Sequence, residues 1–174
     1  NGRYLQIIPN PFPSASIGKY IPLVKHTSWT IILDIPDDAF SEAMLPIIIC
    51  NQEGKTVYVV PVHGKGLYDA IWGNVAIEED LNTVRGVLFD HKGETPGLGA
   101  EITNPAFPAQ FKGKKIFEND EVKLAVVKGQ KTEEEKQYQA DAVTGATNTS
   151  NGVSNMLKDC LSNYIEYFKT LKTK

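Results

Sequence analysis

The chain has 174 residues, of which 41% are hydrophobic and 22% are charged, and its formal net charge is −3 at pH 7. This length and composition are typical of a globular chain that buries its own core, and they exclude disordered and fibrous proteins. Neither the overall charge balance nor any local run is strongly basic, which argues against a nucleic acid as partner.

The N-terminal region is rich in proline, which discourages regular structure. The prolines that precede residue 26 are Pro9, Pro11, Pro13 and Pro22. We therefore expect a loop-like segment over residues 1–25 and a single folded domain over residues 26–174. The β-branched content of Trp29–Ile35 predicts a strand. No stretch reaches the roughly twenty apolar residues that span a bilayer.

Two hairpins are predicted in the middle of the chain. Leu45–Cys50 and Lys55–Val62 flank a turn-rich tetrapeptide of hairpin length. Gly73–Ile77 and Val84–Asp90 flank the acidic segment 78–82, which we interpret as a solvated turn rather than an acid/base pair.

The segment that follows the first hairpin combines glycine, a lysine and aromatic residues. In residues 63–73, two glycines frame Lys65, and Tyr68 and Trp72 follow closely. Such aromatic rings either stack on a planar ligand or lie in the core, and the pattern alone leaves both open.

A second glycine-rich segment, residues 91–101, follows the second hairpin. Gly97 and Gly99 permit a positive φ or a close backbone approach, and Pro96 fixes one dihedral angle. The loop either wraps a planar ligand or simply connects a strand to a short helix. It is not a P-loop, because no Gly-Lys-Ser/Thr follows at the required spacing. It is not a dinucleotide-binding fingerprint either, because the glycine spacing differs and no βαβ unit surrounds it.

The remaining strand and helix signals complete the fold prediction. Ala100–Phe111 is expected to hold short helical turns, limited by its prolines. Glu121–Lys128 predicts a strand, and Gly129–Gln139 a charged loop. The sum is an α+β fold, an antiparallel β-sheet with helices packed on it.

A long amphipathic helix is predicted at the C-terminus, because apolar residues recur there every three or four positions. Its stripe comprises Val153, Met156, Leu157, Cys160, Leu161, Tyr164, Ile165, Phe168 and Leu171. Asn148, Thr149 and Ser150 are candidate N-caps. Cys160 lies on the apolar stripe, so we expect a buried free thiol there.

The turn that precedes this helix, residues 141–150, is small and rich in hydroxyl groups. Helix N-termini present free N–H groups and a partial positive charge, so a phosphate fits there. Gly145 and Ala146 leave room for a bulky group to approach the backbone. Simple capping of the helix is the alternative interpretation.

Asp141–Thr147 resembles the flavinylation motif of the covalent FMN-binding domains, in which an acidic residue precedes Ser/Thr-Gly-Ala-Thr. In that family the last threonine carries FMN through a phosphoester made by a separate FMN transferase. The resemblance implies that Thr147 is the acceptor and that Asp141 is recognised by the transferase. Thr144, Gly145, Ala146 and Thr149 would then surround the phosphate.

The two glycine-rich segments resemble the same family. Residues 94–99 match its Glu-Thr-Pro-Gly-Leu-Gly loop, and residues 64–68 resemble its Gly-Lys-Gly-Leu-Trp motif, with Tyr68 in place of tryptophan. The resemblance implies flavin contacts from both. The residues concerned are Lys65, Gly66, Leu67, Tyr68, His91, Glu94, Thr95, Gly97, Leu98 and Gly99.

The Gly-Lys-Gly-Leu-aromatic segment favours the C subunits of the sodium-translocating NADH:quinone reductase, with the G subunits of the Rnf ferredoxin:NAD oxidoreductase as second choice. The resemblance implies an electron carrier within a membrane complex, with other subunits and an FMN transferase as partners. It also implies an N-terminal membrane helix, which we expect to have been removed from this chain. The domain would face the periplasm at the bacterial inner membrane.

Signals for other chemistry are weak. The three histidines have no metal-ligand spacing, and no serine lies in a nucleophile motif, so we predict neither a metal site nor a catalytic constellation. A triad of Thr147, His91 and Asp141 is disfavoured, because threonine nucleophiles work from a chain N-terminus or with an adjacent base. A docking module without flavin and an enzyme that holds flavin non-covalently remain alternatives.

Overall fold

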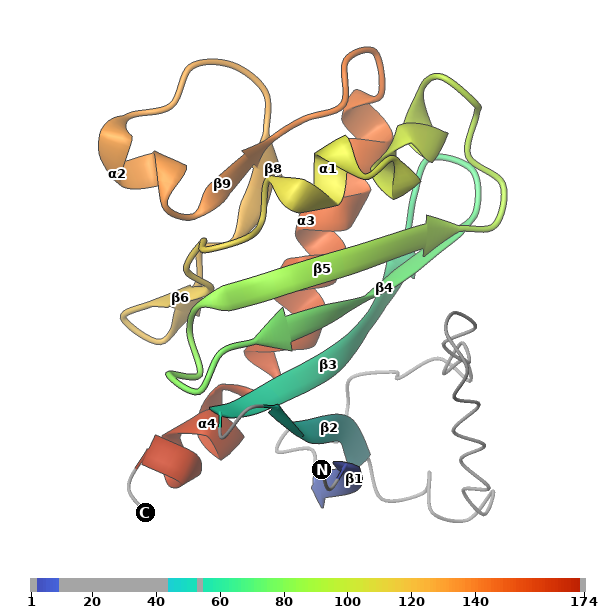
Figure 1. Ribbon diagram of the computed structural model, residues 1–174. Helices are drawn as coiled ribbons and strands as arrows, with labels where there is room; N and C mark the ends of the chain where they lie inside the picture. Colours follow the sequence, from blue (N-terminus) through green and yellow to red (C-terminus); the bar gives the residue numbers. More distant parts are fainter. Residues whose placement is uncertain (1–2, 10–43, 53–54, 173–174) are drawn as a thin grey trace.

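The computed structural model describes residues 3–9, 44–52 and 55–172 (Figure 1). The predicted strand Trp29–Ile35 lies outside these residues. Strand β1 (Arg3–Pro9) lies within the segment that we expected to be loop-like, so that expectation is wrong for residues 3–9. β1 is the edge strand of the sheet, where a terminal proline is tolerated, and it pairs antiparallel with β2.

The main sheet has five antiparallel strands in the order β1-β2-β3-β4-β5. The four that follow β1 are β2 (Met44–Gln52), β3 (Lys55–Lys65), β4 (Ala70–Ile77) and β5 (Val84–His91). Both predicted hairpins are confirmed, β2 with β3 and β4 with β5. Along β4, residues at every second position are buried, as a strand with one covered face requires.

Helix α3 (Thr147–Ser162) lies behind the sheet in Figure 1 and packs on β3. The apolar stripe predicted one helix through Leu171, but the structure ends α3 at Ser162 and begins α4 at Ile165, which runs to Lys172. Ser162 Oγ and Asn163 Nδ2 donate to carbonyl groups of the preceding turn, at 2.8 and 3.0 Å. Such side-chain bonds compete with helix propagation, which accounts for the break.

Short elements connect β5 to α3. They are η2 (Gly99–Thr103), α1 (Ala106–Ala109), β6 (Phe117–Glu118), β7 (Glu121–Val122), β8 (Ala125–Val127), α2 (Glu133–Lys136) and β9 (Gln139–Asp141). The helical turns predicted over Ala100–Phe111 are confirmed. The strand predicted over Glu121–Lys128 is wrong as one element, because the amides of Lys123 and Leu124 turn to the Ile116 carbonyl. The charged loop contains α2, closed by a capping box of Thr132 and Glu135.

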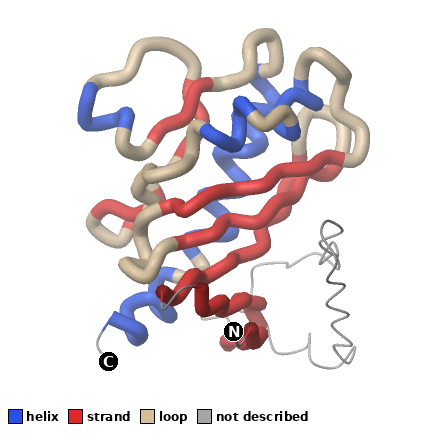
Figure 2. Tube along the Cα trace, in the orientation of Figure 1, coloured by secondary structure: helices blue, strands red, loops and turns tan. Residues whose placement is uncertain are grey.

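The core lies between the sheet and α3, and an aromatic cluster extends it beneath α1. The rings of Phe89, Phe107 and Phe111 pack with centroids 5.3–5.9 Å apart. Phe89 belongs to β5 and Phe107 to α1, so this cluster fixes both ends of the glycine-rich loop between them. Figure 2 shows that the β3–β4 turn, this loop and the start of α3 lie at the same end of the molecule.

Candidate functional site

The chain enters α3 through a tight turn. Ala146 N donates to the Val143 carbonyl at 3.1 Å, and Gly145 has a φ of +76°, as the third residue of a type II turn requires. Ala146 is buried, whereas Thr144, Gly145 and Thr147 are exposed. The predicted acceptor Thr147 therefore stands at the first position of the helix, where a bulky partner can reach it.

The predicted N-caps are wrong. Ala146 occupies the N-cap position of α3 and offers no side-chain acceptor to the first-turn amides of that helix. The hydroxyl of Ser150 instead accepts from Val143 N at 3.1 Å, and that of Thr149 donates to a carboxylate of another segment. Partners outside the helix thus bond the hydroxyls of Thr149 and Ser150 and leave the helix N-terminus suited to an external anion.

Glu94 connects the three predicted segments. Its side chain is only 4% exposed. Oε2 accepts from the Thr149 hydroxyl at 2.5 Å, and Oε1 accepts from the backbone N–H of Tyr68 at 3.0 Å. Burial acts to raise the pKa of Glu94, but the Thr149 hydroxyl and the backbone amides of residues 67–69 outweigh it, and the pKa lies below its ordinary value.

Glycines make this contact possible. A Cβ on Gly66 would lie 2.5 Å from Glu94 Oε1, and one on Gly99 would lie 2.5 Å from Glu94 Oε2. A Cβ on Gly152 would lie 2.4 Å from the Lys65 carbonyl oxygen. Sequence reasoning anticipated a close approach at Gly99 and missed it at Gly152, where a glycine inside a helical stripe was the available signal.

The outer layer of the site is partly apolar. Leu67 is 45% exposed, Tyr68 63% and Leu98 42%, and Lys65, Thr95 and Gly97 are also exposed. A Cβ on Gly145 would lie 2.9 Å from Leu98 Cδ2, so the loop contacts the turn before α3. The structure therefore brings the three predicted segments together.

Two predicted contact residues form hydrogen bonds with Glu94. Thr149 was expected to face a phosphate, but it is 1% exposed and its hydroxyl is committed to Glu94. His91 accepts from the backbone N–H of Glu94 at 3.2 Å through Nδ1, which helps to shape the start of the loop. Both residues lie at the site and stabilise its framework.

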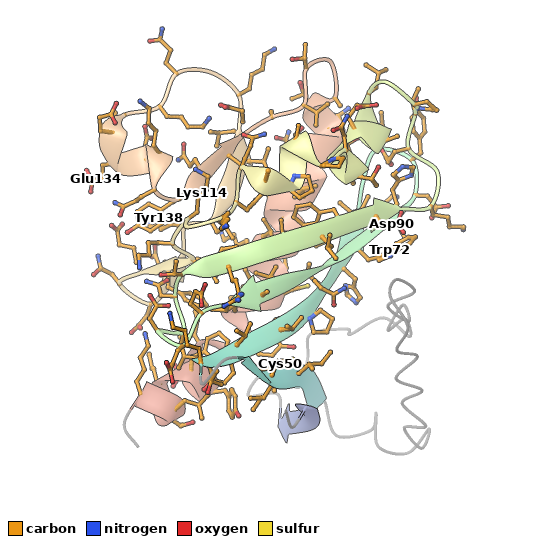
Figure 3. All side chains as sticks on the ribbon, viewed as in Figure 1. Cys50, Trp72, Asp90, Lys114, Glu134 and Tyr138 are labelled. Carbon is orange, nitrogen blue, oxygen red and sulfur yellow. The ribbon has the colours of Figure 1, made fainter. Side chains whose placement is uncertain are left out.

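The two aromatic side chains of segment 63–73 differ in their surroundings. Tyr68 is too exposed to be a core residue. Trp72 pairs with Asp90 across β4 and β5, and Figure 3 shows the two side by side at that end of the sheet. Trp72 is half-buried and alternates with the inward-facing Ile71 and Gly73, so it lies on the face opposite the core.

Asp141, the predicted recognition residue, is held at both its backbone and its carboxylate. Its N–H donates to Gln110 Oε1 at 2.7 Å, and its side chain forms an ion pair with Lys131. The Lys131 side chain is only 7% exposed, whereas that of Asp141 is 74% exposed. The sequence assigned Lys131 only to a charged loop, since no local pattern indicates this partner.

Among the described residues, neither a reactive thiol nor a metal centre is found at this site. Cys160 is a free, half-buried thiol whose sulfur lies 3.4 Å from both His63 N and His63 O, and burial raises its pKa. Within residues 3–9, 44–52 and 55–172, no three His, Cys, Asp or Glu side chains come together as metal ligands. Among the same residues, no helix is both long and apolar enough to cross a bilayer.

Comparison with known proteins shows the family of this chain. A family model described as the FMN-binding domain matches residues 66–162. The C subunit of the Na(+)-translocating NADH-quinone reductase of Pasteurella multocida is 40% identical over 145 residues, which are 78% of this chain and 54% of that protein. The protein of the same name from Vibrio anguillarum is 48% identical over 96 residues, 55% of this chain and 37% of that protein.

Solved structures have the same fold. The crystal structure of the C subunit of the Na(+)-translocating NADH-quinone reductase from Parabacteroides distasonis has a TM-score of 0.70 and 39% identity, covering 82% of this chain and 71% of that chain. The crystal structure of Shewanella oneidensis NqrC has a TM-score of 0.73 and 29% identity, covering 99% of this chain and 85% of that chain.

The chain therefore belongs to the FMN-binding domain family. The relatives it resembles in that family are C subunits of the Na(+)-translocating NADH-quinone reductase. The chain spans about half the length of the curated relatives it matches.

Proposed function

We propose that this domain carries FMN, joined through a phosphoester to the hydroxyl of Thr147, and relays electrons within a sodium-translocating NADH:quinone reductase. The observation that supports this most directly is the exposed Thr147 at a helix N-terminus whose N-cap residue has no side-chain acceptor. A phosphodiester at that position carries a negative charge, which the helix dipole stabilises.

The residues around Thr147 fit a phosphate and a flat ring system. Thr144 is exposed one turn before the helix, and its hydroxyl is suited to donate to a phosphate oxygen. Leu67, Tyr68 and Leu98 present exposed apolar surface on the two other segments of the candidate site, and a ring would shield that surface from water. FMN supplies the electron-transfer chemistry when bound, and the protein holds it and surrounds it with fixed charges and dipoles.

Maturation and assembly follow from the same proposal. An FMN transferase would recognise the exposed carboxylate of Asp141, which the Lys131 ion pair holds in place. Other subunits of the reductase would deliver and accept the electrons, so the domain needs no substrate pocket of its own. The names of the relatives support membership of that membrane complex, and we propose a position on the periplasmic face of the inner membrane.

The test is intact mass under denaturing conditions, for protein co-expressed with an FMN transferase. We expect the wild type to gain the mass of FMN less one water, and Thr147→Ala to gain nothing. Thr170→Ala is the control, since Thr170 is also an exposed threonine but lies on α4, outside this turn, and it should still be loaded.

Two outcomes would contradict the proposal. The first is an unmodified wild type when the transferase is active on another acceptor, which would favour a docking module without flavin. The second is flavin that co-purifies but is released on denaturation, which would indicate non-covalent binding.

A further inference from the structure

Glu94 is a buried carboxylate that holds two distant segments together. Its partners lie in two other segments: the Thr149 hydroxyl in the first turn of α3 and the Tyr68 amide in the β3–β4 turn, at 2.5 and 3.0 Å. These contacts span 55 and 26 residues of sequence. Glu94 therefore determines how the exposed Leu67 and Tyr68 stand relative to Thr147.

The surroundings of this carboxylate favour a persistent negative charge. Within the described part of the chain, its hydrogen-bond donors are a hydroxyl and backbone N–H groups, and no ion pair compensates it. Gly66 and Gly99 pack so closely that a Cβ on either would lie 2.5 Å from a carboxylate oxygen. Neutral donors stabilise the charge without cancelling it, and burial reduces its screening by water.

We infer that Glu94 is the positioning residue of the site, which ties the β3–β4 turn to the acceptor helix, and that its fixed charge lowers the reduction potential of the flavin carried there. The second part rests on the proposed function. Reduction adds electrons to the flavin, and a nearby buried anion opposes added negative charge. The first part concerns the protein alone.

The first experiment tests the tie in protein without flavin, by hydrogen exchange of the backbone amides at residues 67–69. In Thr149→Val and Glu94→Gln we expect these amides to exchange about tenfold faster, because a charge-assisted hydrogen-bond network is lost or weakened. Thr149→Ser retains the hydroxyl and should exchange like the wild type. Wild-type exchange in both Thr149→Val and Glu94→Gln would overturn the positioning role.

The second experiment measures the midpoint potential of the loaded protein. Glu94→Gln keeps nearly the same shape and should have a more positive potential than the wild type. Glu101→Gln is the matched control, because it removes the same charge only seven positions further along, where the carboxylate binds Asn104 instead of the site. A shift no larger in Glu94→Gln than in Glu101→Gln would overturn the electrostatic role.

These two experiments separate the inference from the proposed function. A wild type that gains no flavin overturns the proposed function together with the statement about potential. The hydrogen-exchange result still decides whether Glu94 ties the two segments. If Glu94→Gln does not fold, the comparison of Thr149→Val with Thr149→Ser makes the same decision.

Discussion

At the level of single residues, hydrogen-bond donors hold carboxylates in two of the loops of this protein. Glu94 is one case, and Asp80 in the β4–β5 connection is the other. Asp80 accepts from the backbone amides of Asn82 and Thr83 at 3.0 and 2.7 Å and from the Thr83 hydroxyl, and Lys115 Nζ lies 3.2 Å away. Partial burial acts to raise the pKa of Asp80, but these donors outweigh it and lower the pKa. Each carboxylate thereby fixes the shape of a loop.

Replacing Asp80 with asparagine should therefore destabilise the protein in a pH-dependent way. Because the folded state lowers the pKa of Asp80 from its ordinary value of 3.8, the contribution of this carboxylate to stability is complete only above about pH 5 and is lost progressively as the pH falls toward the folded-state pKa. We expect Asp80→Asn to lower the free energy of unfolding by about 1 kcal/mol at pH 7, a small value because the side chain is half exposed.

Urea unfolding at pH 7 and pH 2.5 measures this difference. The exposed neighbour Glu79 provides the control, and Glu79→Gln should leave stability unchanged at pH 7. An equal loss for Asp80→Asn at both pH values would show that the carboxylate charge is not the cause.

At the level of elements, α3 crosses β3 unusually closely, and glycines at the crossing allow this. A Cβ on Gly152 would lie 2.4 Å from the Lys65 carbonyl oxygen, and one on Gly64 would lie 2.8 Å from Met156 Cβ. The closeness brings the first turn of α3 against the end of β3, and so brings Thr149 within reach of Glu94. Helix propensity alone would favour alanine at position 152, so the packing must outweigh it.

Gly152→Ala should therefore destabilise the protein, although the same change usually stabilises a helix. In an exposed helix this change stabilises by about 1 kcal/mol, but here we expect a loss of about 2 kcal/mol, because the new methyl group collides with backbone. Asn155→Ala, at an exposed position of the same helix, should be neutral or slightly stabilising. Thermal or urea unfolding of the two variants measures both effects, and a stabilised Gly152→Ala would mean that the crossing is looser than described.

The helices and strands also show which parts of the fold can be predicted from the sequence and which cannot. The hairpins and the apolar stripe of α3 depend on local periodicity, so the pattern predicts them correctly. The start of α3 and its break after Ser162 depend on which partners individual hydroxyl and amide side chains bond, and apolar periodicity does not carry that information. Ser150 binds Val143 N and Thr149 binds Glu94, neither of which helical periodicity can indicate.

At the level of the whole molecule, the fold brings the three distant segments of the candidate site to one end of the sheet (Figure 1). Motif resemblance selected these segments, but the contacts that join them come from the strand order and from the position of α3. The exposed residues of this end are contributed by the β3–β4 turn, the loop before η2 and the turn before α3. A group attached at Thr147 and contacting all three would oppose their separation, and hence global unfolding.

Flavin loading should therefore stabilise the folded protein as a whole. If the ring contacts these segments with about 1–2 kcal/mol of net interaction, the melting temperature should rise by roughly 2–8 °C for a domain of this size. Calorimetry of loaded and unloaded wild type measures the shift. Tyr68→Ala should melt like the unloaded wild type when it carries no flavin, because the Tyr68 side chain is 63% exposed, and it should gain less on loading. Equal melting temperatures for loaded and unloaded wild type would instead indicate that FMN is attached at Thr147 but that its ring does not contact the protein. That result would contradict the proposed ring contacts with Leu67, Tyr68 and Leu98.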